Sequence, residues 1–284
     1  MNMVRGMKVA LATCLQMPEP DEDREIIDAA LKTENIDAGW VAWDDPAAEW
    51  KSPKLIVVRS TWNYVHDYPA FLKFTEKISG KSENHASILR WSTHKRYLRD
   101  LDEANFPTVD TVLLPKGSAV ALSTVMKKKK WFSAVVKPAV GAGSFLTQRV
   151  TQQDDAIFAE RLSERDMLVQ PYMAEVETTG ERAIVFIDGE VTHAVRKSPR
   201  LQGQAETTEP VPVEEDEREL TLRLMRWTMR QFPCGALLYG RADLIRDAQG
   251  ELQVMELELA EPSLFLKHSE EAAKRFAQGI ARRA

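Results

Sequence analysis

The sequence contains only two cysteines in 284 residues, Cys14 and Cys234. Two cysteines so far apart form neither a disulfide framework nor the CxxC pair of a zinc or redox site. The sequence also lacks any run of about 18 apolar residues, so it predicts no membrane-spanning helix. Positive charge is not in excess, because 38 Lys and Arg stand against 43 Asp and Glu. A nucleic-acid backbone calls for a basic surface. We therefore expect neither nucleic acid nor a membrane as a partner.

Several common motifs are incomplete. The stretch GKS at 80–82 resembles the end of a phosphate-binding P-loop, but Thr75 stands where that motif needs glycine. A GxG pair begins at Gly141, but Leu146 stands where GxGxxG needs its third glycine. The five histidines are scattered, so we expect no histidine-based zinc site. These absences exclude the nucleotide and zinc sites that are simplest to recognise.

The composition is that of a globular protein, with 44% hydrophobic and 29% charged residues. A chain of 284 residues suggests about two domains. The apolar stretch near the N-terminus is too short for a signal peptide, and we expect a cytoplasmic protein.

The first part of the chain alternates apolar runs with helical periodicity. The patterns predict strands at 8–13 and 54–59, and helices at 21–31 and 69–78. This alternation is typical of a βαβ layer with a parallel sheet.

Later segments mix helices with antiparallel pairs, so the fold class is mixed α/β (α+β). Asp188-Gly189 between two alternating runs predicts a hairpin. The polar stretch 198–217 is expected to be a loop, and the lysines at 127–130 a solvated helix end. Further helices are predicted at about 93–104, at 155–162, at 219–231 and from 269 onward, and further strands at 133–137, 145–150, 167–170, 237–245 and 252–259.

The first feature with a chemical meaning is Lys137, which ends a predicted strand before the small loop Gly141-Ala-Gly-Ser144. Such a loop lets backbone N–H groups approach phosphate oxygens while the lysine supplies charge. A simple β-turn after an edge strand is the alternative.

The second feature is a set of three carboxylates on the last predicted hairpin. Glu256 and Glu258 share one face of a strand, because residues two apart point the same way, and Asp243 lies on the partner strand. Such a cluster suits Mg²⁺, which takes one or two carboxylates and otherwise prefers phosphates and water. Ordinary solvated acids on a half-exposed strand are the alternative.

The third feature is the strand end at Gln170, followed by Pro171 and Tyr172, with Glu181 shortly after. Exposed backbone groups beside apolar side chains could hold a purine, and the glutamate could accept hydrogen bonds from ribose hydroxyls. A plain strand and turn is the alternative.

Taken in order, these segments resemble the ATP-grasp superfamily. The resemblance rests on RWSTHKRYLRDL (90–101), VVKPAVGAGS (135–144), LVQPY (168–172), GERAIVFIDGEVTHAVRK (180–197) and YGRADL through ELELAEPSLFL (239–266). Together with RSTWNY at 59–64, it is nearest to the branch of the O-ureido-serine cyclo-ligases, the D-cycloserine synthetases, and more distantly similar to glutathione synthetase. It implies an N-terminal substrate domain (1–90), a central ATP-grasp subdomain with the glycine loop (91–166) and a C-terminal subdomain with the metal site (167–284).

The resemblance also implies roles for single residues. ATP would be bound by Lys95, Lys137, Gly141, Ala142, Gly143, Ser144, Gln170, Pro171, Tyr172 and Glu181. Mg²⁺ would be bound by Asp243, Glu256 and Glu258. Cationic groups near the transferred phosphate would be Arg241, Lys137, Arg196 and Lys197. The substrate is expected to meet Arg241 and also Arg59, Ser60, Thr61 and Tyr64, which lie just past the C-terminal end of a predicted strand, where open α/β sheets bind ligands. A structural loop with a packed Trp62 is the alternative for 59–64.

Three positions depart from the pattern. Glu258 replaces the more usual Asn at the third metal position, and Ser92 replaces an Asn expected before Lys95. The loop 198–212 lacks the pair of glycines found in relatives. Since this loop is expected to help define the substrate pocket, the substrate is the least determined part of the prediction.

The resemblance implies an ATP- and Mg²⁺-dependent carbon–nitrogen ligase. The γ-phosphoryl group would pass to a carboxylate of a small amino-acid-like substrate, and a nitrogen nucleophile would attack the acyl phosphate. The nucleophile could be intramolecular, as in D-cycloserine formation in antibiotic biosynthesis, or could belong to a second amino acid or a peptide. A non-catalytic ATP-binding module is the alternative of another class. A homodimer is a family-based expectation.

Overall fold

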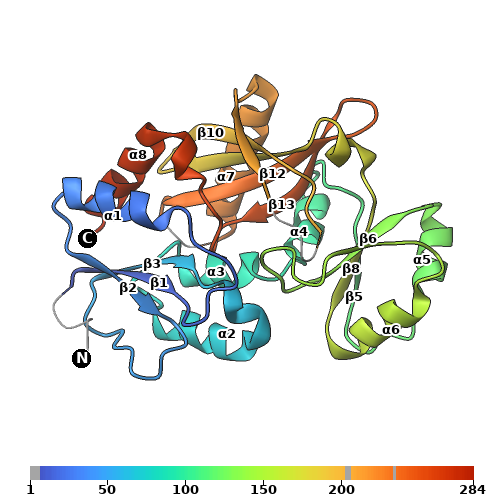
Figure 1. The fold of residues 1–284 in the computed structure, drawn as a ribbon, viewed down its shortest axis with the longest axis horizontal. Coiled ribbons are helices and arrows are strands. Elements are labelled where there is room, and N and C mark those ends of the chain that lie inside the picture. Colours follow the sequence, from blue (N-terminus) through green and yellow to red (C-terminus); the bar gives the residue numbers. More distant parts are fainter. Residues whose placement is uncertain (1–6, 202–205, 233–234) are drawn as a thin grey trace.

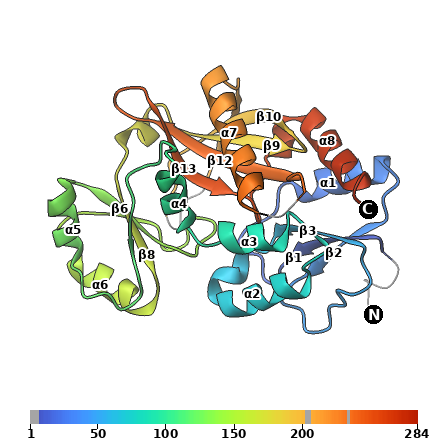
Figure 2. The ribbon, with the colours of Figure 1, turned by 180° about the vertical axis from the view of Figure 1, so that it is seen from behind.

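The computed structural model describes residues 7–201, 206–232 and 235–284, which form three sheets covered by helices (Figures 1 and 2). The strand orders are β2-β1-β3-β4, β5-β8-β6-β7 and β11-β10-β9-β12-β13. The predicted mixed α/β class is confirmed. None of the helices in the described ranges is long and apolar enough to span a membrane.

The N-terminal sheet is parallel throughout, which confirms the predicted βαβ layer. Its two central strands, β1 and β3, are buried along their whole length, because both faces of the sheet are covered. Val9 and Leu11 pack toward α1 and α8, whereas Ala10 and Ala12 pack toward α2. The elements are β1 (Val9–Thr13), α1 (Arg24–Thr33), β2 (Ala38–Ala42), β3 (Leu55–Ser60), the 3₁₀ helix η1 (Trp62–His66), α2 (Tyr68–Lys77), β4 (Ser82–Glu83) and α8 (Glu270–Ala281). The sequence did not predict β2, whose run Ala-Gly-Trp-Val-Ala has only a weak strand pattern.

The predicted helix at 93–104 is wrong in its bounds. The structure has two short helices, α3 (Ala86–Ser92) and α4 (Tyr97–Glu103), separated by a bend. At the bend the backbone N–H of Lys95 donates to the carbonyl of Ala139, at 2.7 Å. A contact with a distant loop thus replaces an intrahelical hydrogen bond, and it carries Lys95 to the glycine loop.

The second sheet is antiparallel and lies at one end of the molecule with two helices on it (Figure 1). Its elements are β5 (Val112–Leu114), α5 (Leu122–Lys129), β6 (Ala134–Pro138), β7 (Gln148–Val150), α6 (Asp155–Glu164) and β8 (Met167–Pro171). β7 is shorter than the predicted strand at 145–150, because residues 143–146 form a turn. The domain boundary predicted between 166 and 167 falls before β8, although β8 pairs with β5 and β6. We propose that this boundary lies after residue 171.

The third sheet is antiparallel and packs between α7 on one face and α8 with the N-terminal layer on the other. Ala183 and Val185 face α8, and Ile184 and Phe186 face α7, as the two-residue period of a strand requires. The hairpin at Asp188-Gly189 is confirmed, with φ of 46° and 93° at the two turn residues. The elements are the 3₁₀ helix η2 (Ala174–Glu177), β9 (Glu181–Ile187), β10 (Glu190–Lys197), β11 (Thr208–Val211), α7 (Glu215–Gln231), β12 (Tyr239–Arg246), β13 (Leu252–Glu258) and the 3₁₀ helix η3 (Leu266–His268).

The loop predicted at 198–217 is wrong in its second half. Residues 208–211 form β11, which within the described ranges pairs with β10 alone, so that Pro210 is tolerated on an edge strand. Helix α7 begins at Glu215, where Glu214 and Glu217 form a capping box. A glutamate at the N-cap is not among the usual start signals, so the sequence placed this start too late.

One buried side chain fastens the N-terminal layer to the third sheet. Asn84 donates to the carbonyls of Tyr239, at 2.8 Å, and Leu259, at 2.9 Å, and accepts from the N–H of Leu238, at 2.8 Å. Only 1% of Asn84 is exposed. Water therefore cannot replace these three hydrogen bonds.

We predict that Asn84→Ala lowers the free energy of unfolding by about 2–4 kcal/mol, because three buried backbone groups lose their partners. Urea unfolding followed by circular dichroism measures the change. Gln249→Ala, in an exposed turn, should stay within about 0.5 kcal/mol of the parent protein. Equal stability of the two variants would contradict the assigned role of Asn84.

Candidate active site

A cavity of about 410 Å³ lies where the three sheets meet. Its lining comes from the loop after β3, from the bend between α3 and α4, from β6 and the glycine loop, from the end of β8, and from β9, β10, β12 and β13. Pockets of this size hold small ligands and cofactors. Most of the residues that the sequence singled out are in this lining: Tyr64, Lys95, Lys137, Gly141, Ala142, Gly143, Ser144, Gln170, Pro171, Tyr172, Glu181, Lys197, Arg241, Asp243, Glu256 and Glu258.

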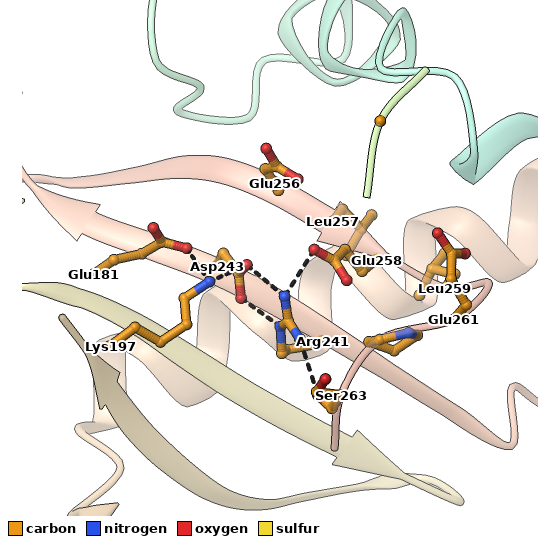
Figure 3. Close-up of polar contacts among 12 residues, drawn as sticks. Glu181, Lys197, Arg241, Asp243, Glu256, Leu257, Glu258, Leu259, Glu261 and Ser263 are labelled. Atoms are coloured by element: carbon orange, nitrogen blue, oxygen red, sulfur yellow. Dashed lines mark hydrogen bonds and ion pairs between the residues drawn. The ribbon is translucent and has the colours of Figure 1, made fainter. Parts of the chain in front are cut away.

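The pairing of β12 with β13 builds the floor of the cavity. Arg241 stands opposite Glu258, and Asp243 stands opposite Glu256, so four charged side chains share one face of the sheet. The alternate residue Leu257 points into the core on the other face. The alternation predicted from the sequence therefore places the acids as expected (Figure 3).

Arg241 bridges two of these carboxylates. Its Nε lies 2.7 Å from Oδ1 of Asp243, and its Nη2 lies 2.7 Å from Oε1 of Glu258. Lys197 reaches the other oxygen of Asp243, at 2.8 Å, and also pairs with Glu181 (Figure 3). Burial by itself would raise the pKa of Asp243, but Arg241 and Lys197 hold it below its usual range.

In Glu181 and Glu258, unlike Asp243, the effect of burial on the pKa outweighs the attraction of the neighbouring cations. Burial raises the pKa of Glu181 to about 7, and the attraction of Lys197 only partly offsets it. Burial likewise raises the pKa of Glu258, although Arg241 lowers it. These two carboxylates are therefore the ones on which an added cation would act most strongly.

Two lysines converge on Glu256. Lys137 lies 2.7 Å from Oε1 and Lys95 lies 3.0 Å from Oε2. Burial alone would lower the pKa of Lys95, but Glu256 and Glu258 raise it. The pKa of Glu256 falls because the two lysines outweigh the effect of burial. The three side chains thus carry one net positive charge, which suits an anionic ligand such as a phosphate group.

The glycine loop closes one side of the cavity. Lys95 also donates to the carbonyl of Gly141, at 3.2 Å, which ties the loop to the lysine pair. Gly143 and Ser144 have φ of 56° and 58°, in the left-handed region. Residues 143–146 form a turn, and successive backbone N–H groups in a turn can form a concave site that binds anions. The loop therefore fits the predicted phosphate cradle.

The end of β8 forms the opposite end of the cavity. The Tyr172 N–H donates to the carbonyl of Ser133, at 3.1 Å, and the guanidinium of Arg149 lies 3.7 Å from the centre of the Tyr172 ring. The side chain of Gln170 donates to Thr111, at 2.8 Å. The strand end is thus fixed by its neighbours, and Tyr172 and Glu181 both line the cavity, as the predicted purine and ribose binding would require.

Four predicted site residues lie outside the cavity lining. Arg196 points to the other face of β10 from Lys197 and pairs with Glu209, at 2.7 Å. Arg59 is fully buried, donates to the carbonyl of Pro262, at 2.9 Å, and lies against the ring of Tyr239. The structure also places two neighbours of Arg59 in the buried interior, away from the lining: Ser60 and Thr61.

Several lining residues were not predicted. Glu19 and Arg200 form an ion pair of 2.6 Å beside Gly143, linking the loop after β1 to the loop after β10. Glu261 lines the cavity three residues beyond Glu258. Of the loop predicted at 198–212, residues 202–205 lie outside the described part, as does Cys234. Glu19 and Glu261 have no local sequence signal, because their neighbours come from distant segments.

The residues present fit ATP and Mg²⁺ by their chemistry. The lysine pair and the glycine loop suit phosphates, and the carboxylates of Asp243, Glu256 and Glu258 suit Mg²⁺. Within the described residues, no group of three or more His, Cys, Asp and Glu side chains converges as a metal cage. The carboxylates are instead turned to lysine and arginine, which is consistent with a metal that arrives together with phosphate oxygens.

Comparison with known proteins gives consistent results. The family described as D-cycloserine synthetase DcsG, N-terminal domain, matches residues 9–85. The cycloserine biosynthesis protein DcsG of Streptomyces lavendulae is 31% identical over 282 residues, covering 93% of this chain and 94% of the relative. The crystal structure of D-cycloserine synthetase DcsG has a TM-score of 0.90 at 29% identity and covers 97% of this chain and 99% of its own.

A more distant likeness concerns the fold. The ATP-grasp ligase PsnB, solved with a variant of its minimal precursor, Mg and ADP, has a TM-score of 0.64 at 14% identity, covering 98% of this chain and 99% of its own. The predicted ATP-grasp fold is confirmed.

We predict that Glu256→Gln lowers the free energy of unfolding at pH 7 by about 3–5 kcal/mol, because two buried lysines lose their counter-charge. The pKa of Glu256 is lower in the folded protein than in the unfolded chain. The contribution of Glu256 to the free energy of unfolding is therefore fully present above the unfolded pKa. It is lost as the pH falls through the folded pKa, so the difference between variant and parent should narrow between pH 4.5 and about 2. Denaturant unfolding across this range measures it.

Glu209→Gln is the matched control, because Glu209 pairs with Arg196 at the surface. It should change the free energy of unfolding by less than about 1 kcal/mol at either pH. A Glu256→Gln effect that is equally small, or that does not change with pH, would contradict the assigned ion pairs.

Proposed function

The chain belongs to the D-cycloserine synthetase family of ATP-grasp ligases, and from this premise we propose that it cyclises an α-amino acid of the O-ureido-serine type. It is an ATP-dependent ligase that uses ATP and Mg²⁺. In the proposed reaction the γ-phosphoryl group passes from ATP to the substrate carboxylate and leaves ADP. A nitrogen of the same molecule then attacks the acyl phosphate, forms the C–N bond and expels inorganic phosphate. The substrate is a small molecule, while a homodimer and a cytoplasmic location stay predictions.

The observation that carries this proposal is the gathering of three sets of groups around one cavity. Lys95 and Lys137 lie at the phosphate end, the metal carboxylates lie on β13 and β12, and Tyr64 with Glu261 lines the part next to the N-terminal layer. A ligase of this type needs phosphate, metal and carboxylate substrate within reach of one another.

The proposed chemistry assigns little covalent work to the protein. Lys95, Lys137 and the glycine loop would hold the phosphates, and Asp243, Glu256 and Glu258 would hold Mg²⁺, which offsets phosphate charge when bound. Arg241 stands between two of those carboxylates and would face the charge that builds up during phosphoryl transfer. Positioning and charge neutralisation in a buried site then account for the rate.

Water must stay out while the acyl phosphate exists, because it would hydrolyse the intermediate. The ion pair between Glu19 and Arg200 crosses from the loop after β1 to the loop after β10, next to the glycine loop. We propose that this contact closes the cavity over the substrate. It joins the N-terminal layer to the ATP-binding part at the point where a small substrate would enter.

We predict that the protein releases phosphate from ATP and Mg²⁺ with O-ureido-serine as the single amino acid. Lys137→Met should lower kcat by about 100- to 1,000-fold, because it removes one preorganised charge from the transferred phosphoryl group. Lys129→Met, which loses an exposed lysine paired with Asp110, is the matched control and should keep the parent rate. A coupled phosphate assay and mass spectrometry of the product measure both.

Other outcomes would decide between the remaining hypotheses. Phosphate release only with pairs of amino acids would contradict cyclisation and favour a dipeptide ligase. Tight ATP binding with no release across a panel of amino acids would favour a peptide substrate or the non-catalytic ATP-binding module.

A further inference from the structure

The RSTWNY segment, which the sequence predicted to touch the substrate, acts largely through another part of the chain. Arg59 donates to the carbonyl of Pro262, at 2.9 Å, and Trp62 donates to the carbonyl of Glu261, at 2.8 Å. The hydroxyl of Tyr64 interacts with the Glu261 carboxyl group. Three side chains of this segment therefore converge on the two residues Glu261 and Pro262.

Other elements hold the segment 261–266, which begins with these two residues. Arg241 donates to the carbonyl of Ser263, at 2.9 Å, and the carboxylate of Asp23 accepts from the N–H groups of Leu264, at 2.6 Å, and Leu266, at 2.8 Å. A backbone fixed by this many buried contacts presents its side chains in one orientation. Glu261 is the member of this segment whose carboxyl group lines the cavity, with Ser263 beside it.

Charge pairing sets Glu261 apart from the acids on the floor of the cavity. Those acids each have a lysine or arginine partner within 3.0 Å: Glu181, Asp243, Glu256 and Glu258. Within the described residues, Glu261 makes no salt bridge. Burial and the nearby Glu258 charge raise the pKa of Glu261 to about 7, and the hydroxyl of Tyr64 and the charges of Lys95 and Arg241 offset this only in part. A ligand cation at this point would relieve both penalties.

We propose that Glu261 binds the α-ammonium group of the substrate and makes the protein selective for free α-amino acids. This inference rests on the proposed function of the cavity. Arg59 and Trp62 are then positioning residues, which hold the Glu261 backbone, and Tyr64 orients its carboxylate.

The assignment has a chemical consequence for ring closure. An ammonium group held by a carboxylate has no lone pair and cannot attack an acyl phosphate. The α-nitrogen is thereby kept from attacking the acyl phosphate of another substrate molecule. Within its own molecule it would form a strained three-membered ring, so ring closure falls to the nitrogen bonded to the side-chain oxygen, which forms a five-membered ring.

The test compares O-ureido-serine with its α-N-acetyl derivative in the parent protein and in Glu261→Gln. The parent should prefer the free amine by about 10- to 100-fold in kcat/KM, the range of a charge-assisted hydrogen bond. Glu261→Gln should raise the KM for O-ureido-serine by a similar factor with little change in kcat, because the contact is the same in ground and transition states. The KM for ATP should stay within about threefold of the parent value.

Two further variants keep the test decisive. Trp62→Phe removes the indole donor to Glu261 while keeping a ring, and it should raise the same KM by a smaller factor. Glu76→Gln, an exposed carboxylate on α2, is the charge-matched control and should match the parent. An ATP-induced rise in melting temperature shows that each variant is folded, and the comparison of the two compounds on the parent protein needs no variant.

The outcomes distinguish a failure of the role proposed for Glu261 from a failure of the proposed function. A parent protein that turns over both compounds equally well, or an unchanged KM in folded Glu261→Gln, would overturn the role of Glu261 and leave the proposed function standing. No turnover of O-ureido-serine, despite ATP binding, would overturn the proposed function and this inference with it.

Discussion

The structure depends on the neutralisation of charges that β12 and β13 hold away from water. Their register sets Arg241 against Glu258 and Asp243 against Glu256 on one face. Each buried charge would be costly alone, so every neighbouring element contributes a partner: Lys197 comes from β10, Lys137 from β6 and Lys95 from the bend between α3 and α4. The second and third sheets and the bend between α3 and α4 therefore meet at this point, where their charged residues pair with one another. The charged side chains of such a site are in place before a ligand binds. Phosphate and metal would then replace contacts that these side chains now make with one another.

The N-terminal layer has a different task in the same cavity. Besides the shared apolar core, it holds the third sheet and the chain after β13 by hydrogen bonds to backbone groups, from Asn84, Arg59, Trp62 and Asp23. These contacts fix the chain just after β13, where the proposed metal ligands are followed by Glu261. The layer thus shapes the substrate end of the cavity by holding a piece of the third sheet in place.

Much of the fold and of the proposed ATP-binding end of the cavity could be predicted from the sequence, because those signals are local. The alternation of Leu257 and Leu259 with Glu256 and Glu258 fixes which face the acids share, and Lys137 precedes a recognisable small-residue loop. The substrate end could not be predicted, because its determinants are distant in the chain. Trp62 and Glu261 are 199 positions apart. A two-residue period says that only one of Arg196 and Lys197 faces the cavity, but not which one. Tertiary contacts also decided the break at Lys95 and the edge strand β11.

The most direct test of the account is a crystal structure of the protein with ADP, Mg²⁺ and O-ureido-serine. The account predicts phosphate oxygens at Lys95 and Lys137, Mg²⁺ at the carboxylates of Asp243, Glu256 and Glu258, and the substrate ammonium group at Glu261. Phosphates bound away from both lysines, or an amino acid bound outside this cavity, would contradict it.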